Sequence, residues 1–466
     1  MSRSVSIYVC QSCGAQTRQF FGRCNNCGEW NSIIEEKINQ KSDKSIYTKF
    51  NSPKEKSPYR SELISQTNNQ LIERISSGYK ELDRVLGGGL VPGSLVLIGG
   101  DPGIGKSTLI LQSATEMAHH RSVLYVAAEE SAQQVKLRWN RIEDAESNLH
   151  LLAETDLEMV IKELDHLKPE VAVIDSIQAL HDQNLSSSPG SVAQVRECSA
   201  ALQQIAKRQN ISLLIIGHVT KDGMLAGPKV LEHLVDAVLT FEGDRFASHR
   251  LLRGVKNRFG ATSELGVFEM QADGLSEVPN PSELFLSKTS APGISTIVTC
   301  EGTRPLAIDI QALLNPTSYA SPRRTTTGIE INRLHQILAV LEKNMNLSLS
   351  RYDCYLAVAG GLEVEEPGAD LGIAAAIVSS FKDIEIEEGV VFIGEIGLAG
   401  QLRLVRQMQQ RINEVIRLGY KTLIIPDGID TSEFETNQKL KILKASNINQ
   451  ALIHALNHIK PKLYYL

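Results

Sequence analysis

The nonapeptide Gly100-Asp101-Pro102-Gly103-Ile104-Gly105-Lys106-Ser107-Thr108 decides how the middle of this 466-residue chain folds. It fits the pattern G-x-x-x-x-G-K-[ST], in which glycines let backbone N–H groups close around a phosphate. A short apolar run, residues 94–98, precedes it, and residues 108–114 read as the opening of a helix. An ordinary glycine turn before a helix is the simpler alternative. The order of strand, glycine loop and helix favours a nucleoside triphosphate site.

The residues of this loop have different expected roles. Lys106 can reach the β- and γ-phosphates of ATP, and the hydroxyl of Ser107 can ligate Mg²⁺. Asp175 follows the apolar run 171–174, at the carboxyl end of a buried strand. A carboxylate there can hold the water shell of Mg²⁺, although a lone aspartate in such a place also caps helices. We predict that the whole loop and Asp175 bind ATP and Mg²⁺.

The catalytic base is expected on a different strand from Asp175. The residue after Asp175 is Ser176 and not a glutamate, whereas Glu129 and Glu130 follow the apolar run 123–127. A carboxylate on that neighbouring strand can accept a proton from the attacking water, so we predict that Glu129 is the base. Either glutamate is also placed to cap the helix that follows.

The whole chain has the composition of a globular protein. Apolar residues make up 42% and charged residues 22%, and the net charge is −6. This excludes a chain-wide positive field, so a nucleic-acid site must be a local patch. No apolar run approaches the ~18 residues of a membrane span, and residues 1–9 contain no signal-peptide core. We expect a cytoplasmic protein of about three domains.

Four of the seven cysteines lie in the first 27 residues. Cys10 and Cys13 form one C-x-x-C knuckle and Cys24 and Cys27 a second one, each followed by glycine. Four thiolates suit a structural Zn²⁺ site, which leaves no open position for chemistry. A redox-active dithiol is the alternative, but no βαβ pattern surrounds these cysteines. Four aromatic residues are expected to pack this module or to offer a face to a partner: Tyr8, Phe20, Phe21 and Trp30.

The chain divides into four expected parts, of which the first is a zinc finger over residues 1–34. Residues 35–70 are rich in Lys, Ser, Asn and Gln and cannot bury enough apolar surface to order themselves, so we expect a flexible linker. Residues 71–281 alternate apolar runs with amphipathic stretches, as in an α/β fold with a parallel sheet covered by helices. After Pro279-Asn280-Pro281 the pattern changes, and residues 282–466 form a further domain. The expected strands of the α/β domain are 95–98, 123–127, 171–174, 211–216 and 237–241.

Four sequence elements together are similar to the bacterial RadA family, also called Sms, of RecA-related recombination and repair ATPases. They are the cysteine knuckles, the nonapeptide, Val-Ile-Asp-Ser-Ile-Gln (173–178) and Lys-Asn-Arg-Phe-Gly (256–260), in this order over essentially the whole chain. The resemblance implies a RecA-like P-loop ATPase core and a homo-hexameric ring stimulated by single-stranded DNA. It also implies branch migration on single-stranded and branched DNA during homologous recombination and DNA repair, with a functional link to the RecA recombinase.

The basic segment around this pentapeptide is expected to couple hydrolysis to DNA movement. Residues 245–263 contain five Lys or Arg and no Asp or Glu. Residues 251–256 read as a strand, which would place Lys256 and Arg258 on one face. There they can reach the γ-phosphate of an adjacent subunit, as in DnaB-like motors, which fits a ring because no arginine finger is apparent near the P-loop. A basic sheet edge protected against aggregation is the alternative.

Two polar, glycine-containing loops, 182–191 and 220–229, are expected to line the channel of a RecA-like motor and to contact DNA. As isolated sequence they also fit plain connections. A KaiC-like signalling ATPase is the alternative function, since it shares the RecA core and a Glu-Glu pair after the second strand. The single P-loop and the cysteine knuckles argue against it.

The carboxy-terminal domain resembles the proteolytic domain of Lon without its Ser–Lys dyad. Strands are expected at 295–300 and 354–359 and a helix at 369–380. Asp370 stands at the position of the Lon serine and Gln409 at that of its lysine, so the nucleophile and its amine base are absent. The resemblance implies an α+β scaffold without peptidase activity. Five arginines are candidates for a duplex-binding face or are scattered surface residues: Arg323, Arg324, Arg403, Arg406 and Arg411.

Overall fold

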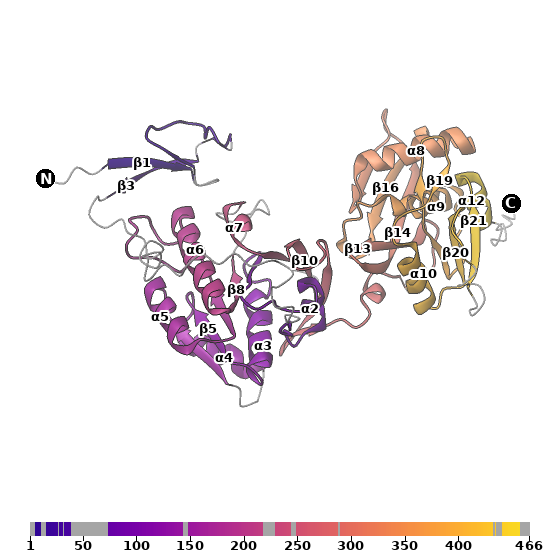
Figure 1. Cartoon of the computed structure of the whole chain (residues 1–466). Coiled ribbons are helices and arrows are strands. Elements are labelled where there is room, and N and C mark those ends of the chain that lie inside the picture. Colours follow the sequence, from indigo (N-terminus) through magenta and orange to yellow (C-terminus); the bar gives the residue numbers. More distant parts are fainter. Residues whose placement is uncertain are drawn as a thin grey trace, which may run out of the picture. The chain divides into compact units, whose positions relative to one another are not determined.

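The computed structural model of this protein describes residues 5–10, 15–26, 28–30, 32–38, 73–142, 148–217, 229–243, 248–287, 289–431, 434 and 440–456. The chain divides into two compact units, Met1–Val278 and Pro279–Leu466 (Figure 1). The border after Val278 lies close to the one expected after Pro281. Within the described residues, no helix is both long and apolar enough to cross a membrane.

The amino-terminal part, residues 5–38, is a small antiparallel sheet that we call the zinc module. β1 (Val5–Cys10) pairs with β2 (Gln16–Thr17) and with β3 (Ile33–Ile38). We predicted from the sequence that this module ends at residue 34. In the structure β3 continues to Ile38, which pairs with Val5. Main-chain hydrogen bonds form this pairing irrespective of side chains, so the polar composition of residues 35–37 did not reveal it. The rest of the expected linker lies outside the described residues.

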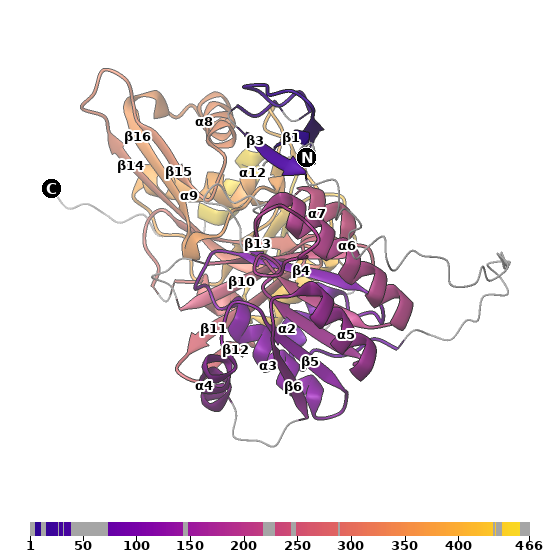
Figure 2. The ribbon, with the colours of Figure 1, turned by 90° about the vertical axis from the view of Figure 1, so that its left-hand side faces the viewer.

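A nine-stranded sheet forms the centre of residues 73–278 (Figure 2). Its strand order is β12-β11-β10-β9-β4-β8-β7-β5-β6. Six neighbouring strands are parallel: β9 (Ala237–Glu242), β4 (Leu95–Gly100), β8 (Ser212–Ile216), β7 (Val171–Asp175), β5 (Val123–Ala127) and β6 (Leu149–Ala153). Three antiparallel strands extend it: β10 (His249–Asn257), β11 (Leu265–Gln271) and β12 (Gly274–Glu277). All five predicted strands are present, and their parallel arrangement brings their carboxyl ends to one edge.

Helices cover both faces of this sheet (Figure 2). One face is covered by α2 (Lys80–Leu86), α3 (Lys106–Ala118) and α4 (Ala132–Ile142), and the other by α5 (Leu157–Leu167), α6 (Val192–Gln209) and α7 (Lys229–Leu234). Successive residues of β4 face opposite sides of the sheet. Ile98 belongs to the core on the first face and Leu97 to the core on the second. Because both faces are buried, these strands read as continuous apolar runs.

The carboxy-terminal unit contains a mixed seven-stranded sheet with the order β15-β16-β14-β13-β17-β20-β21. Its strands are β13 (Ile294–Glu301), β14 (Arg304–Pro316), β15 (Arg324–Thr327), β16 (Tyr352–Val358), β17 (Val390–Phe392), β20 (Thr422–Pro426) and β21 (Lys441–Ala445). A separate hairpin consists of β18 (Glu395–Ile396) and β19 (Leu402–Arg403). The α-helices are α8 (Ile331–Met345), α9 (Asp370–Lys382), α10 (Met408–Arg417) and α12 (Ile448–Leu456). Short 3₁₀ turns cover Pro281–Leu284, Leu349–Arg351, Ala359–Gly361 and Pro367–Ala369.

Two helices of this unit, α9 and α10, pack on opposite faces of its sheet. Ile297 of β13 lies so close to Gly372 of α9 that a Cβ on residue 372 would be 2.1 Å from its side chain. The next strand residue, Val298, belongs to the core that contains Ile412 of α10. Successive strand residues face opposite sides, so the sheet separates the two helices.

Candidate functional site

The phosphate-binding loop joins β4 to α3 at the carboxyl edge of the nine-stranded sheet. β4 ends at Gly100, where φ is +147° and a Cβ would lie 2.6 Å from the carbonyl oxygen of Phe241. Gly103 has a φ of +77° and no heavy atom within 4 Å of the place of a Cβ, so a ligand can approach its backbone closely. α3 begins at Lys106, and its N-cap Gly105 has no side chain to bind the first N–H groups. These groups are therefore available to phosphate oxygens.

Lys106 is buried at the base of this loop, with 4% of its surface exposed. Its Nζ donates hydrogen bonds to the carbonyl oxygens of Gly100 at 2.7 Å and Asp101 at 2.9 Å. Burial lowers the pKa of Lys106, while the negative charges of Asp175, Glu129 and Asp101 act in the opposite direction. The residues assigned from sequence to phosphate binding, Mg²⁺ binding and proton transfer thus lie within electrostatic reach of one another.

Asp175 is the last residue of β7 and is 8% exposed. The hydroxyl of Tyr125, on the neighbouring β5, donates a 2.6 Å hydrogen bond to Oδ2 of Asp175. Burial raises the pKa of Tyr125 well above its ordinary value, and the charge of Asp175 raises it further. The sequence interpretation missed Tyr125. Its only signal was a lone aromatic residue in an otherwise aliphatic strand.

The two candidate bases, Glu129 and Glu130, have different surroundings. The N–H groups of Ala128 and Glu129 donate to the carbonyl oxygen of Asp175, at 2.7 and 3.3 Å, which brings this turn against the end of β7. The hydroxyl of Ser176 donates to the exposed carboxylate of Glu129. Glu130 instead forms an ion pair with Arg138. Of the two, Glu129 is the one whose charge acts on Lys106.

These residues fit ATP and Mg²⁺. The ammonium of Lys106 is held by two backbone carbonyls, which phosphate oxygens can replace. The helix N-terminus and open glycine backbone would hold the phosphates. Carboxylate and hydroxyl oxygens are the ligands that Mg²⁺ prefers, so Asp175 and Ser107 would hold the metal or its water shell.

Lys256 and Arg258 lie at the opposite edge of the sheet from this loop. β10 has a bulge between Gly254 and Lys256, and Arg258 follows the strand and does not lie on it, so the expected alternation along one strand does not hold. Nζ of Lys256 donates to the carbonyl oxygens of Val235, at 2.8 Å, and Glu232. Arg258 pairs with Asp236 at 3.0 Å. The two cations are nevertheless within electrostatic reach of one another. Burial is the main cause of the lowered pKa of Lys256, and the charge of Arg258 lowers it further.

The zinc module brings together the first cysteine of each knuckle. Cys10 and Cys24 belong to one buried cluster with Ile33. Their N–H groups make equivalent hydrogen bonds five residues ahead, from Cys10 to Ala15 at 2.9 Å and from Cys24 to Glu29 at 2.8 Å. Two loops of the same form around one core fit the paired-knuckle Zn²⁺ site. Cys13 and Cys27 lie outside the described residues, which by themselves contain no cluster of three potential metal ligands.

At the positions matched to the Lon dyad, the structure has a buried ion pair and an exposed amide. Asp370 is 1% exposed and binds the guanidinium of Arg333 in α8 through both carboxylate oxygens. The N–H of Ile396 donates to the same carboxylate at 2.9 Å. Burial raises the pKa of Asp370, and both donors oppose this shift. Asp370 thus ties α9 to α8, whereas Gln409 is exposed on α10.

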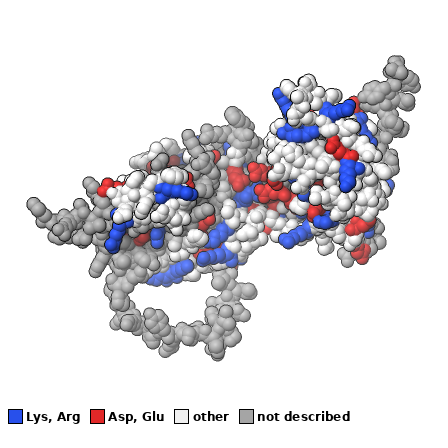
Figure 3. All heavy atoms as spheres, turned by 90° about the horizontal axis from the view of Figure 1, so that it is seen from above, with Lys and Arg blue, Asp and Glu red and all other residues white. Residues whose placement is uncertain are grey.

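Arg411 corrects one expectation about DNA contacts. It is 1% exposed, and its guanidinium binds both carboxylate oxygens of Glu366, at 2.6 and 2.5 Å. Such a residue is not accessible to a duplex. The sequence contained the signal, because position 411 falls on the apolar stripe of α10 between Met408 and Val415. On the face drawn in Figure 3, Lys and Arg side chains of this unit are scattered among neutral ones and do not gather in one patch.

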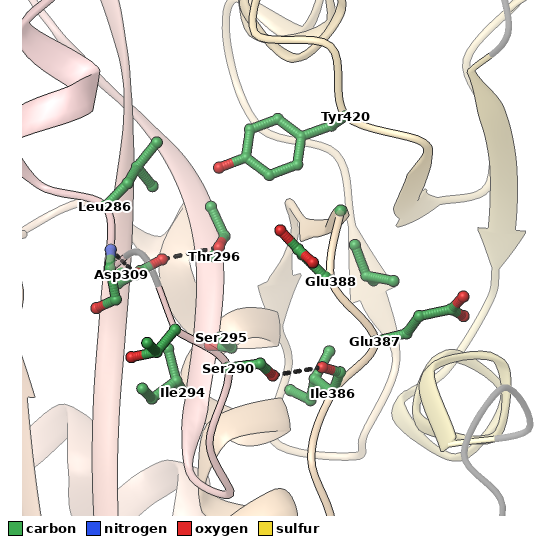
Figure 4. Close-up of a pocket in the computed structure, with 14 residues that line it drawn as sticks. Leu286, Ser290, Ile294, Ser295, Thr296, Asp309, Ile386, Glu387, Glu388 and Tyr420 are labelled. Atoms are coloured by element: carbon green, nitrogen blue, oxygen red, sulfur yellow. Dashed lines mark hydrogen bonds between the residues drawn. The ribbon is translucent and has the colours of Figure 1, made fainter.

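Two cavities open in the carboxy-terminal unit. One, of about 210 Å³, is lined by Thr296, Asp309 and the exposed Glu387 and Glu388 (Figure 4). Asp309 already accepts hydrogen bonds from the hydroxyl of Thr296 at 2.8 Å and from a backbone N–H at 2.6 Å. The other, of about 710 Å³, is lined by Asp370, five glutamates and one arginine. Three carboxylates line the first cavity, and in the second six carboxylates face one arginine, which disfavours the phosphate backbone of DNA at both.

Comparisons with known proteins relate this geometry to a family. Profiles described as "AAA domain", "Rubredoxin metal binding domain" and "Subunit ChlI of Mg-chelatase" match residues 59–224, 8–35 and 330–429. The DNA repair protein RadA of Synechocystis sp. is 52% identical over 92% of this chain and 90% of its own length. The one of Listeria monocytogenes is 44% identical over 98% and 99%. A crystal structure of the RadB recombinase is 25% identical over 44% of this chain and 99% of its own, with a TM-score of 0.36.

The fold and the site define a RecA-like P-loop ATPase with an amino-terminal zinc ribbon and a ChlI- and Lon-like carboxy-terminal domain. The RadA relatives match it over nearly their full length. The chain belongs to the RadA family of DNA repair proteins. The resemblance indicated by the sequence motifs is confirmed, and the KaiC-like alternative is the weaker one.

Proposed function

We propose that this protein is a DNA-dependent ATPase of recombinational repair, which drives branch migration on single-stranded and branched DNA. The observation that carries the proposal is the convergence of Lys106, Asp175 and Glu129 at one edge of the sheet. It occurs in a chain whose full-length relatives are DNA repair proteins. A RecA-like core of this type can convert hydrolysis into movement along DNA when its subunits form a ring around the strand.

Hydrolysis depends on Lys106, Glu129 and Ser176 in this proposal, together with Mg²⁺. When bound, Mg²⁺ neutralises the charge that develops on the phosphates of ATP. Lys106 exchanges the carbonyls of Gly100 and Asp101 for phosphate oxygens. Glu129 accepts a proton from the attacking water, while the hydroxyl of Ser176 keeps its carboxylate oriented. Glu130 is the weaker candidate for the base because Arg138 already neutralises it.

The proposed DNA path uses the loops at the carboxyl edge of the sheet. Loop 182–191 is anchored to α6 by Gln194, which accepts from the N–H of Asp182 at 2.9 Å and donates to the carbonyl of Ser187 at 3.0 Å. This anchorage leaves the polar residues between them to face a strand in the centre of a homo-hexamer. The second loop, 220–229, lies outside the described residues except for its last position.

The other parts of the chain complete the proposal. A structural Zn²⁺ is held by the four amino-terminal cysteines, as the buried Cys10 and Cys24 support. The carboxy-terminal domain is a scaffold without peptidase activity, since Asp370 is committed to Arg333. A functional link to the RecA recombinase follows from the branch-migration role. Casein should remain intact with ATP and DNA present.

The test is ATP hydrolysis measured with and without single-stranded DNA. Lys106→Ala should abolish turnover, because it removes the ammonium that is placed to bind the β- and γ-phosphates. Glu129→Gln should still bind ATP but hydrolyse it about 10²–10⁴ times more slowly, which is the usual contribution of a general base. Glu130→Gln is the matched control and should stay near the parental rate. Hydrolysis that does not respond to DNA would refute the proposed function.

A further inference from the structure

The zinc module leaves three of its four aromatic rings largely on its surface, while Tyr8 packs against its core and, edge to face, against Phe20, with ring centres 5.8 Å apart. Its buried cluster consists of Cys10, Cys24 and Ile33. In contrast, Phe20 is 60%, Phe21 39% and Trp30 69% exposed. Burying an aromatic ring stabilises a fold strongly, and a domain this small has little other apolar surface to bury. Aromatic rings kept on its surface therefore point to a binding role and not to packing.

These rings and two arginines are close in the sequence, and Arg23 and Gly22 lie against Trp30 in the structure. Phe20 and Phe21 precede Gly22, whose Cβ position lies 3.9 Å from the ring of Trp30. Arg23 is paired with Trp30 across a β-bridge, and its guanidinium carbon lies 5.8 Å from the centre of the indole ring. Arg18 is exposed two residues before Phe20. We call Arg18, Phe20, Phe21, Arg23 and Trp30 the aromatic face.

We propose that the aromatic face binds single-stranded DNA by base stacking. Exposed rings accept the faces of unpaired bases, and arginines beside them attract the phosphates, which together make a sequence-tolerant site. The charge of the segment that carries Arg18, Phe20, Phe21 and Arg23 fits this ligand, because residues 15–26 contain two arginines and no Asp or Glu, although Glu29 precedes Trp30. Nε of Arg23 donates to the carbonyl of Gly28 at 2.7 Å, which holds the guanidinium beside the indole while its terminal nitrogens can bind phosphate.

This site is additional to the ATPase core, although it rests on the proposed function for the class of ligand. The two assignments fail in different experiments. Hydrolysis that DNA does not stimulate would refute the proposed function. Hydrolysis that DNA stimulates while Trp30 makes no contribution to DNA binding would refute the role of the aromatic face.

The chain contains a natural reporter for this site, since it has two tryptophans. Trp139 donates its indole N–H to Thr115 at 3.1 Å in the ATPase domain, so Trp139→Phe in the full chain leaves Trp30 as the only tryptophan. Titration with a 20-nucleotide oligothymidylate, without added nucleotide, should quench the emission of Trp30 saturably. Unchanged emission at oligonucleotide concentrations that fully stimulate hydrolysis would overturn the proposal.

Binding measurements on the otherwise native chain do not depend on that variant. Trp30→Ala should weaken binding of a fluorescent oligothymidylate about tenfold to a hundredfold, and Trp30→Phe should restore most of it, because stacking needs a ring. Leu137→Ala is the matched control, since Leu137 is 66% exposed on α4, and it should have no effect. Arg18→Ala should reduce the slope of log K against log salt by about 0.7. Equal affinity of Trp30→Ala and the parent, or quenching by a partner protein and not by DNA, would reject single-stranded DNA as the ligand.

Discussion

At the scale of single residues, Tyr125 holds the carboxylate of Asp175, which we propose as a ligand of Mg²⁺ or of its water shell. The side chain of Tyr125 is fully buried. Its hydroxyl donates the 2.6 Å hydrogen bond to Oδ2 of Asp175. Burial, followed by the charge of Asp175, raises the pKa of Tyr125, so the hydroxyl keeps its proton and remains a donor. This bond fixes Oδ2 of Asp175 and so restricts how the whole carboxylate is oriented.

We expect Tyr125→Phe to weaken the response to Mg²⁺ about tenfold or more, as the loss of partners behind metal ligands generally does. The Mg²⁺ concentration for half-maximal hydrolysis measures this, while ATP binding without Mg²⁺ should change little. Tyr79→Phe is the matched control, because the hydroxyl of Tyr79 bonds to Gln112 in the same core and not to Asp175. Equal Mg²⁺ requirements of both variants would contradict the role of Tyr125.

The lowered pKa of Lys106 predicts how ATP binding depends on pH. Burial is the main cause, so Lys106 loses its proton at a lower pH than an ordinary lysine. ATP binds the ammonium form, and its phosphates stabilise that form. Affinity should therefore fall in a pH window below the ordinary lysine pKa of about 10.5, and binding should take up protons in that window. Calorimetry in two buffers of different ionisation enthalpy measures this uptake, and an affinity that stays constant over the window would contradict it.

At the scale of elements, burial decided what could be predicted. β5 was predicted at its observed bounds because a strand buried on both faces reads as an unbroken apolar run. β10 is longer than the predicted strand 251–256 and has a bulge, because pairing with β9 and β11 sets its length and register. Arg411 was misassigned for a related reason. Its position on the apolar stripe of α10 indicated burial, but an arginine is buried only with a partner, and that partner, Glu366, is distant in sequence.

The cysteines should divide into two chemical groups. Burial raises the pKa of Cys198 to about 12 and those of Cys300 and Cys354 to about 11, so these thiols stay protonated near neutral pH and should alkylate slowly. Removal of zinc by a chelator should make the other four react fast, because metal binding provides most of the folding free energy of so small a module.

Mass spectrometry after iodoacetamide treatment, with metal analysis beside it, counts both groups. After zinc has been removed by the chelator, excess Mg²⁺ is added back for the hydrolysis assay. Basal ATP hydrolysis should then be retained, because the ATP site shares no residue with the zinc module. Seven cysteines that react alike before chelation, or protein purified without zinc, would contradict the assignment.

At the scale of the whole molecule, Lys106 lies at one edge of the sheet and Lys256 and Arg258 lie at the opposite edge. Lys106 follows the carboxyl end of β4, whereas Asp236, the partner of Arg258, accepts a 3.0 Å hydrogen bond from the N–H of Leu95 at the amino end of the same strand. A six-residue strand is about 20 Å long, so Lys256 and Arg258 cannot contact the nucleotide of their own subunit. A neighbouring subunit can place its nucleotide against them, which is why we favour a ring.

A mixture of two inactive variants tests this arrangement. Lys106→Ala removes the phosphate clamp, and Arg258→Gln removes a cation that we expect to act on the neighbouring subunit. In mixed rings at equal amounts, about a quarter of the interfaces combine a native clamp with a native cation, so DNA-stimulated hydrolysis should recover to about a quarter of the parental rate. If Arg258 acts within its own subunit, no interface is repaired and the mixture stays inactive.

Native mass spectrometry establishes that mixed rings have formed. Thermal unfolding establishes that the Arg258→Gln variant, in which Asp236 loses its ion pair with Arg258, is folded. Mixed, folded rings without recovery would show that the cations at the amino edge serve the subunit's own structure and not its neighbour's nucleotide.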